Sequence, residues 1–463
     1  MFVAAQGTLV EDTIIMHLDF DDIDALFVQN GLPLGILATN FQVDVHRVVY
    51  NTPDVDGTPT TASGLICIPT GDTCAMPMMA YLHGTKVKKD DTFYYLNGEW
   101  FLGVVNASSG YVTCLPDYLG LGMSPGIHPY QHTESQATAS VDILRASRII
   151  CEQEDKQLNG QLFIVGYSQG GHATLGLHRM IQEELSDEFT VTASAPGSGP
   201  YDISGSQLDM VAALEPYAQP GYLPYLIQSY QHVCGNLYNT LQDIYVSPYD
   251  VTLPPLLDGT ATMSELNLAM PAIPREIFQQ SYADAFFADP QHPMQIALRD
   301  NDVYEWIPEA PVMFNYCRSD EEVTYLNTIV ASEYMIANGA TDIQVIERDT
   351  VIGHFECAQP SIIFSKFWFD SMAELCTEYV GIEDEPSLER MSVFPNPVSD
   401  GAVRFSNHSE IVVRVSDIQG REVIANQVIR PNGILNLNGI NPGILLITIQ
   451  EDDLVFTQRL VVQ

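Results

Sequence analysis

The stretch QLFIVGYSQGGHATLGLHRM, residues 161–180, decides the fold of this 463-residue chain. Its first part, Leu162–Val165, is an apolar run typical of a buried strand, and the residues after Gly171 suit a helix that begins with small side chains. The turn Gly166-Tyr167-Ser168-Gln169-Gly170 has the pattern G-x-S-x-G, whose glycines leave room for a strained conformation at the serine. The helix N-terminus directs its partial positive charge at the place where an oxyanion would form. This context predicts that Ser168 is a nucleophile.

A serine hydroxyl needs a base, and in this type of strand–turn–helix arrangement the base is a histidine that comes after the acid in the chain. Four histidines follow the helix: His232, His292, His354 and His408. Two of them fall in a long insertion and one in the C-terminal tail. His354 follows the last expected strand of the sheet, on the loop of residues 350–354, and we predict that it is the base. His172 lies one turn after Ser168 and is expected to be a packing residue.

The acid that orients the base is predicted at Asp320, three residues after the expected strand Pro311–Cys317. Glu321 and Glu322 are competitors. We expect both to begin the following helix, where acidic side chains suit the helix dipole.

Two backbone donors are expected to stabilise the oxyanion. The N–H of Gln169 is one of them by its position after the serine. The second is predicted at Thr85, on the loop after the buried strand Met76–Leu82. His83, on the same loop, is expected to have a structural role.

Strands and helices alternate along most of the chain, which predicts a mostly parallel sheet with helices on both faces. Residues 1–40 are poorly periodic, with one helical patch near Asp21–Gln29. The other expected strands are Phe41–Tyr50 and Thr60–Pro69, which form a hairpin, and Tyr111–Leu115, Thr190–Ala195 and Asp342–Ile346. The expected helices are one from the capping box Thr133–Gln136 to about Cys151, Glu321–Ala337, and one after Pro360.

Residues Tyr201–Ile307 interrupt the alternation with ten tyrosines, many prolines and helical pieces at Asp209–Glu215 and Glu276–Phe287. We expect a helical cap over the site. The sequence changes character again after an acidic linker at 381–390. Residues 391–463 have short β segments and frequent Asn and Gly, which predicts a small β-sandwich. The predicted domains are therefore 1–380, with the cap at about 201–307, and 391–463.

Acidic residues outnumber basic ones by 59 to 19, which gives a net charge of −40. Such a surface repels nucleic acid and anionic membranes, so neither is expected as a partner. The chain has no run of eighteen apolar residues, and no transmembrane segment is expected. Phe2–Ala5 is compatible with the tail of a signal peptide or with an ordinary start.

Eight cysteines suit an exported protein without requiring one. Cys67 and Cys74 flank a turn and form one candidate disulfide pair, and Cys357 and Cys376 form a second. Cys114 is expected to be a buried thiol. No cysteine or histidine spacing indicates a metal site, and no cofactor is expected.

The catalytic region resembles the secretory lipase branch of the α/β-hydrolases, which includes fungal lipase A-type enzymes and bacterial exported esterases. The motifs that carry the resemblance are YLHGT (81–85), PDYLGLG (116–122), HPY (128–130), GYSQGGH (166–172) and APGSGPYD (195–202). It implies an α/β-hydrolase fold, hydrolysis of carboxylic or triacylglycerol esters, the triad Ser168, Asp320 and His354, and a cap over the site. It also implies Asp117 as a further oxyanion candidate.

The tail resembles the C-terminal sorting domain of the type IX secretion system. The matching segments are VFPNP (393–397), DIQGR (417–421) and LNGINPGI (437–444), and Leu445 stands where that family usually has an aromatic residue. The resemblance implies the type IX secretion machinery as a partner and a secreted or cell-surface location. The alternative is a generic β-sandwich that binds carbohydrate or another partner.

Together these features predict a secreted serine esterase or lipase that forms an acyl-enzyme and acts on a small-molecule or lipid ester. Two alternatives stay open: a serine peptidase of the same fold, and a catalytically silent binding protein on the cell surface.

Overall fold

The computed structural model describes residues 6–32, 37, 39–71, 74–376, 393–394, 398, 401–405, 409–417, 421–431, 433–440, 443–451 and 454–462. The chain divides into two compact units, one built mainly from residues 1–377 and one from residues 378–463. The residues of the predicted signal-peptide tail and the linker predicted at 381–390 lie outside the described residues. The predicted domain boundaries therefore stay predictions.

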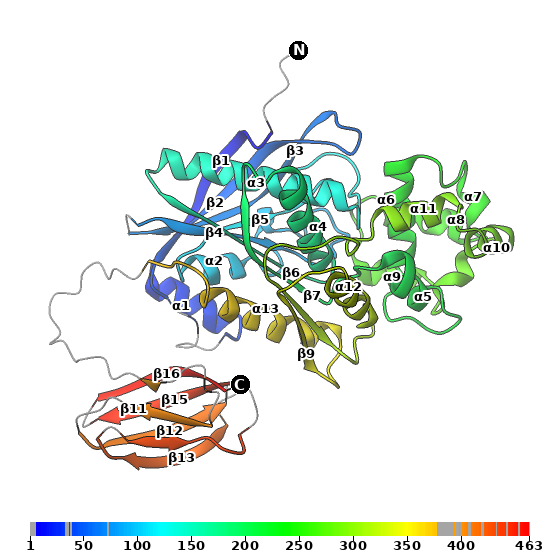
Figure 1. Ribbon diagram of the computed structural model, residues 1–463. Coiled ribbons are helices and arrows are strands. Elements are labelled where there is room, and N and C mark those ends of the chain that lie inside the picture. Colours follow the sequence, from blue (N-terminus) through cyan, green and yellow to red (C-terminus); the bar gives the residue numbers. More distant parts are fainter. Residues whose placement is uncertain are drawn as a thin grey trace. The chain divides into compact units, whose positions relative to one another are not determined.

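The first unit is organised around a nine-stranded sheet (Figure 1). Strands β1, β2, β3 and β5 pair in antiparallel fashion, and β5, β4, β6, β7, β8 and β9 pair in parallel. In spatial order the strands are β1 (Leu9–Leu18), β2 (Gln42–Pro53), β3 (Pro59–Thr70), β5 (Val112–Pro116), β4 (Met76–Leu82), β6 (Leu158–Tyr167), β7 (Thr190–Gly197), β8 (Val312–Cys317) and β9 (Ile343–Asp349). The carboxyl ends of the parallel strands therefore meet at one edge, where the ligand sites of such sheets form.

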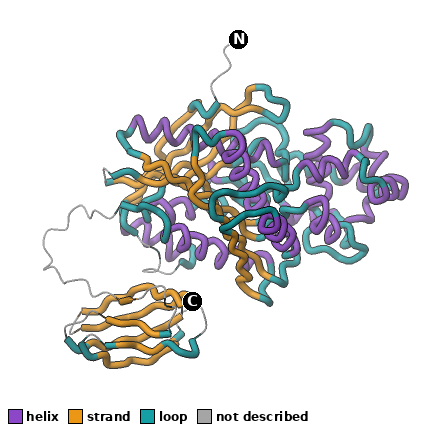
Figure 2. The backbone as a smooth tube through the Cα atoms, in the orientation of Figure 1, coloured by secondary structure: helices purple, strands orange, loops and turns teal. Residues whose placement is uncertain are grey.

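Helices cover both faces of this sheet, as predicted (Figure 2). The long helix α3 (Thr133–Gln153) and α4 (Gln169–Glu184) pack on one face, and α2 (Phe101–Ala107) and α13 (His354–Asp370) pack on the other. The elbow strand β6 contributes to both layers because successive side chains of a strand point to opposite faces. Leu162 and Ile164 belong to the core under α3 and α4, whereas the ring of Phe163 lies 5.0 Å from that of Phe369 on α13.

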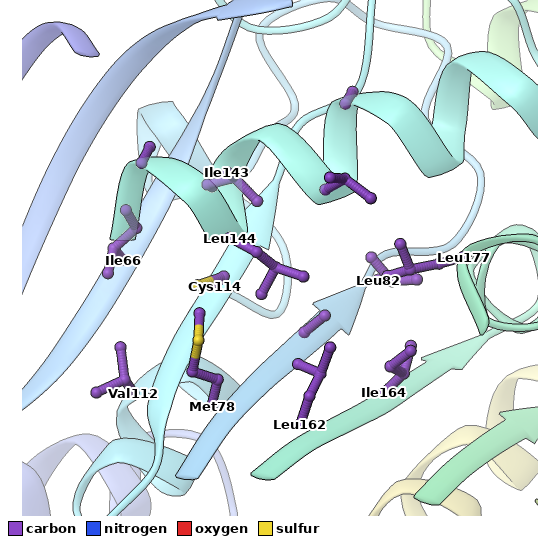
Figure 3. Close-up of a cluster of buried hydrophobic side chains, with 14 of the residues drawn as sticks. Ile66, Met78, Leu82, Val112, Cys114, Ile143, Leu144, Leu162, Ile164 and Leu177 are labelled. Atoms are coloured by element: carbon purple, nitrogen blue, oxygen red, sulfur yellow. The ribbon is translucent and has the colours of Figure 1, made fainter. Parts of the chain in front are cut away.

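A large cluster of buried apolar side chains lies under α3 (Figure 3). Ile143 and Leu144 of α3 and Leu177 of α4 lie over Met78 and Leu82 of β4, and all five side chains are buried. Cys114 is buried in the same cluster as a free thiol, which confirms its predicted state. This packing fixes the end of β4 against the end of β6, and both strand ends carry residues of the site.

The segment between β7 and β8 is a helical cap with a core of its own, as predicted. It appears in green and yellow-green in Figure 1. Its α-helices are α5 (Leu208–Val211), α6 (Tyr222–Cys234), α7 (Leu241–Ile244), α8 (Tyr249–Thr252), α9 (Met263–Ala269), α10 (Gln280–Ala288) and α11 (Pro293–Asp300). The helical pieces expected at 209–215 and 276–287 are shorter, because Pro274 begins a separate short 3-10 helix and α5 ends at Val211.

Helix α1 (Phe20–Gln29) confirms the helical patch predicted near Asp21–Gln29, but strand β1 was not predicted. The largely exposed β1 is an edge strand paired with β2, and its apolar pattern is weak. Three other local predictions were wrong. Helix α3 is capped by His132, whose side chain accepts the N–H of Ser135, rather than by the predicted box. Helix α12 (Leu326–Ala337) begins after Glu321 and Glu322, and α13 begins at His354 rather than after Pro360.

The two predicted disulfide pairs were also wrong. Cys67 is a buried thiol on β3 that faces Gly103 of α2, so it cannot reach across the turn. Instead Cys74 is bonded to Cys376, with 6.1 Å between their Cα atoms, and Cys317 is bonded to Cys357, with 6.0 Å between theirs. Both bonds join segments that are far apart in the sequence, and the sequence pattern around a turn does not reveal such distant partners.

The second unit is a small β-sandwich. One sheet has the order β10 (Val393–Phe394), β11 (Ala402–Phe405), β14 (Ile434–Asn436), and the other has the order β13 (Glu422–Ile429), β12 (Ile411–Asp417), β15 (Gly443–Glu451), β16 (Leu454–Val462). Val403 and Leu435 from the first sheet share one buried cluster with Val413, Ile447 and Leu460 from the second. Among the described residues of the chain, no helix is both long and apolar enough to cross a membrane.

Candidate active site

Ser168 occupies a strained turn between β6 and α4. Its backbone angles, φ of 60° and ψ of −121°, lie in a region that residues other than glycine rarely adopt. Its N–H donates to the carbonyl of Gly197 at 2.9 Å. A Cβ atom at Gly166 would collide with the Gly170 backbone, and one at Gly170 with the backbone of Leu82. The glycines of the motif are therefore required by close backbone packing, and the turn has the form predicted from the sequence.

His354 and Asp320 lie in direct contact. His354 begins α13, Asp320 lies on the loop after β8, and His354 Nδ1 is 2.7 Å from Asp320 Oδ2. Both side chains are buried. The other oxygen of Asp320, Oδ1, accepts the N–H groups of Glu322 at 3.0 Å and Val323 at 2.8 Å, so the carboxylate is held by its own loop. This arrangement orients the imidazole with a hydrogen on Nδ1 and leaves Nε2 for a reacting group.

The backbone of His354 is held next to the elbow. The hydroxyl of Tyr167, the residue before Ser168, donates to the carbonyl of His354 at 2.7 Å, and the two rings are 5.0 Å apart. The N–H of His354 donates to Glu321 Oε2 at 3.0 Å. No hydrogen bond joins Ser168 Oγ to His354 in the described part of the chain, and such bonds often tighten only when substrate binds.

Three carboxylates control the charge of His354. Burial alone would lower its pKa, but the hydrogen bond and charge of Asp320, together with the charges of Glu322 and Glu321, raise the pKa above its usual value. A raised pKa makes the imidazole a stronger base once it is neutral.

Glu322 is a functional candidate that the sequence analysis placed in a helix. Its Oε2 lies 3.9 Å from His354 Nε2 and accepts the hydroxyl of Tyr222 at 2.8 Å, and its Oε1 accepts the side-chain amide of Gln219 at 2.7 Å. Its carbonyl accepts the hydroxyl of Tyr217. The side-chain amide of Gln207 donates to the same carbonyl at 2.9 Å, so four cap residues hold the acid loop. The repeated acidic residues after Asp320 are a sequence signal for such a loop, but they resemble a helix start equally well.

The predicted oxyanion donors lie around the elbow. Gln169 begins α4 directly after Ser168, and a Cβ atom at Gly84, the residue before Thr85, would lie 3.6 Å from Ser168 Cβ, which places the Gly84 backbone close to the serine. In the described part of the chain, neither the N–H of Gln169 nor that of Thr85 donates to a protein acceptor. Two unpaired N–H groups beside a serine suit an oxyanion, but this role stays a prediction.

The HPY segment, residues 128–130, supports these donors, a role that the sequence analysis did not assign. His128 Nδ1 donates to the carbonyl of Leu119 at 2.8 Å, and its Nε2 accepts the side-chain amide of Gln169 at 2.9 Å. Burial lowers the pKa of His128 to about 3, so the ring is neutral and this pattern is fixed. The hydroxyls of Tyr130 and Thr85 are 3.0 Å apart.

The other sequence candidates have structural partners. The buried carboxylate of Asp117 accepts the hydroxyl of Ser63 at 2.7 Å and the N–H of Tyr94 at 3.3 Å, so it bonds to β3 and to the short 3-10 helix Phe93–Tyr95 rather than to the elbow. His83 is buried, with Nδ1 2.6 Å from the carbonyl of Gly84. His172 is buried, with Nε2 2.8 Å from the carbonyl of Asn301.

An apolar pocket opens at Ser168 and extends into the cap. Its walls come from the segment after β7, from α6, α10 and α11, and from Val323 on the acid loop. The aliphatic and aromatic lining residues are Ile203, Leu208, Val211, Leu223, Leu226, Phe286, Met294 and Leu298. The lining also includes three tyrosines, Tyr130, Tyr217 and Tyr222. None of the described residues that line the pocket is charged. Such a pocket suits an uncharged, apolar group.

Comparisons with known proteins agree with this fold. Residues 392–463 match the family of secretion system C-terminal sorting domains. A search of curated proteins gave no match.

Similar solved structures that cover most of the chain include two bacterial proteins and one lipase. The rice cell wall degrading esterase LipA from Xanthomonas oryzae is 28% identical, with a TM-score of 0.71 over 80% of this chain and 100% of that one. A putative hydrolase from Legionella pneumophila is 25% identical, with a TM-score of 0.73 over 79% and 98%. Candida antarctica lipase A in its closed state shares the fold at 15% identity, with a TM-score of 0.61 over 82% and 85%.

The fold, the elbow and these likenesses lead to one assignment. The first unit has the α/β-hydrolase fold of these lipase-like proteins, and residues 392–463 are a type IX secretion system C-terminal sorting domain, so this is a secreted or cell-surface protein.

Proposed function

We propose that this protein is a serine carboxylic-ester hydrolase of the esterase or lipase type. The observation that carries the proposal is the 2.7 Å contact between Asp320 and His354, which Tyr167 joins to the elbow of the strained Ser168, together with the apolar pocket that Ser168 lines. The likeness to an esterase at 28% identity over the whole length of that protein supports the same reaction class.

In the proposed reaction, His354 Nε2 takes the proton of Ser168 while Oγ attacks the ester carbonyl. Asp320 keeps the other imidazole proton on Nδ1 and stabilises the positive ring. The N–H groups of Gln169 and Thr85 stabilise the oxyanion. His354 then gives its proton to the leaving alcohol. A water molecule, activated by the same imidazole, hydrolyses the acyl-enzyme.

The pocket favours an ester with an apolar acyl chain. A peptidase of the same fold that recognises a charged peptide end would need a charged group to bind it, whereas the described lining residues of this pocket carry no charge. The many aliphatic side chains between Ser168 and α11 instead suit the burial of methylene groups.

Hydrolysis of a series of p-nitrophenyl esters from acetate to palmitate tests this function. We expect turnover by the wild-type protein, none above background by Ser168→Ala, and labelling of the wild type alone by a fluorophosphonate. A wild-type protein that is folded but neither hydrolyses any ester nor is labelled would instead be a binding protein. Preferential cleavage in a peptide panel would favour a peptidase.

A further inference from the structure

A buried disulfide lies directly below the acid–base pair. Cys317 is the last residue of β8, three residues before Asp320, and Cys357 lies in the first turn of α13, three residues after His354. Both cysteines are fully buried and pack in one cluster with Tyr167, the residue next to Ser168. The bond therefore connects the segment that carries the acid to the helix that carries the base.

The two sides of the acid–base contact are held differently. Asp320 is fixed by two N–H groups of its own loop. His354 follows the loop of residues 350–353, where Val351 is 78% exposed, and the sheet pairing between β8 and β9 ends at Cys317 and Asp349. The disulfide adds a covalent cross-link from the end of β8 to the first turn of α13, which the backbone joins directly to β9.

Small displacements of a catalytic group matter, since an error of about 1 Å can lower a rate by about 10²-fold. The hydrogen bonds of Tyr167 and Glu321 to the His354 backbone fix one residue of α13. The disulfide adds a second fixed point one turn along the helix. It therefore restrains the first turn of α13, which carries the imidazole, relative to the segment that carries Asp320.

We propose that the Cys317–Cys357 disulfide positions His354 against Asp320, and that the protein reaches full activity only after this bond forms outside the reducing cytoplasm. The proposal rests on the function proposed above. Formation of the bond removes two protons and two electrons from the thiols, which pass by thiol–disulfide exchange to a protein or small-molecule disulfide that becomes a dithiol. An exported protein meets such oxidants after it leaves the cytoplasm.

The test compares two pairs of substitutions in the full chain. Cys317→Ala with Cys357→Ala removes the bond below the site, and Cys74→Ala with Cys376→Ala removes the other disulfide as the matched control. In the first variant we expect kcat for p-nitrophenyl butyrate to fall about tenfold or more, with KM within about twofold. We also expect the hydrogen-bonded Nδ1 proton of His354 to weaken or disappear in the ¹H NMR spectrum. The control variant should keep kcat and this resonance.

Should the alanine variant not fold, reduction of the folded Cys74→Ala/Cys376→Ala variant by a dithiol provides the comparison instead, because Cys317–Cys357 is the remaining disulfide there. We expect the same loss of kcat and of the NMR resonance. A protein that lacks the Cys317–Cys357 bond but keeps the wild-type kcat and resonance would overturn the proposal. If the wild type hydrolyses no ester, the proposed function fails, while the NMR comparison still decides the positioning role.

Discussion

The carboxylate of Glu322 lies 3.9 Å from His354 Nε2, the ring nitrogen that Asp320 does not contact. Tyr222 and Gln219 of the cap donate hydrogen bonds to the same carboxylate. Glu322 therefore connects two parts of the molecule, the cap over the site and the charge around the base. Its effect on each can be measured separately.

Glu322→Gln should move the acid limb of the pH profile of kcat/KM to lower pH. The limb follows the pKa of His354, because only the neutral imidazole accepts the proton of Ser168. Glu322 is one of the negative groups that raise this pKa, after Asp320. Removal of its charge lets the imidazole stay neutral at lower pH. Glu134→Gln, at an exposed position on α3, is the control and should leave the limb in place. An unchanged or higher limb in Glu322→Gln would contradict the prediction.

A second prediction separates this local charge from the charge of the whole surface. Residues 1–387 carry 13 basic and 51 acidic side chains, and this excess should also favour the imidazolium. Screening shortens such fields from about 30 Å at about 0.01 M salt to about 3 Å at about 1 M. The acid limb of the wild type should therefore move to lower pH in high salt, whereas the shift caused by Glu322→Gln should persist there. A wild-type limb that does not respond to salt would exclude the surface as a contributor.

Substitutions of the three triad residues should lower kcat by different amounts. Ser168→Ala or His354→Ala should lower kcat by about 10⁶-fold, because triad members act as a unit. Asp320→Asn should lower it by about 10⁴-fold, because the amide favours the wrong tautomer of the imidazole. Steady-state kinetics on p-nitrophenyl butyrate measures all three. Near wild-type activity in Asp320→Asn together with collapse in Glu321→Gln would assign the acid to Glu321.

The parts of the site that the sequence predicted share one property. Ser168, Asp320 and His354 each follow a parallel strand of the sheet, and the carboxyl ends of such strands meet at one edge. Strand order and motif spacing were therefore enough to place Asp320 against His354. The elbow was predictable for a similar reason, since only glycine fits where Gly166 and Gly170 approach neighbouring backbone.

The parts that the sequence did not predict depend on contacts across long separations. Glu322 was expected to begin a helix because acidic residues are common there, but the helix begins at Leu326 and Glu322 instead bonds to the cap, about a hundred residues earlier in the chain. The partner of Cys317 likewise lies on α13. No local pattern distinguishes a cysteine that bonds 40 residues away from one that closes a nearby turn.

The C-terminal sandwich should be dispensable for catalysis. It has its own buried core, formed by residues of both of its sheets. A chain that ends at Glu385 should therefore fold and hydrolyse soluble esters at the wild-type rate, and the mature protein from the native host should lack the tail. Circular dichroism, kinetics and mass spectrometry of the secreted protein check these outcomes. Reduced activity of the shortened chain, or a tail retained in the mature protein, would indicate a binding or structural role for residues 391–463.

The length of the cap pocket should set the preferred acyl chain. Each methylene buried there contributes about 0.8 kcal/mol, so two further carbons raise kcat/KM by about tenfold while the pocket still has room. We therefore expect kcat/KM to rise from acetate to about six to ten carbons and then to fall. Proline and tyrosine residues of the cap suit a semi-rigid wall, so interfacial activation should be weak.

Leu226→Trp tests this pocket directly. Leu226 lines the pocket from α6, and an indole there fills space that the chain would occupy, so the optimum should move to shorter esters while acetate is hydrolysed at the wild-type rate. Leu268→Trp is the matched control, because Leu268 is in the cap on α9 but 85% exposed, and the profile should not change. A wild-type kcat/KM that declines steadily as the chain lengthens from acetate would contradict a chain-binding pocket, because each added methylene would then lower kcat/KM. The same profile in wild type and Leu226→Trp would place the acyl chain elsewhere and leave the roles of Ser168 and His354 unaffected.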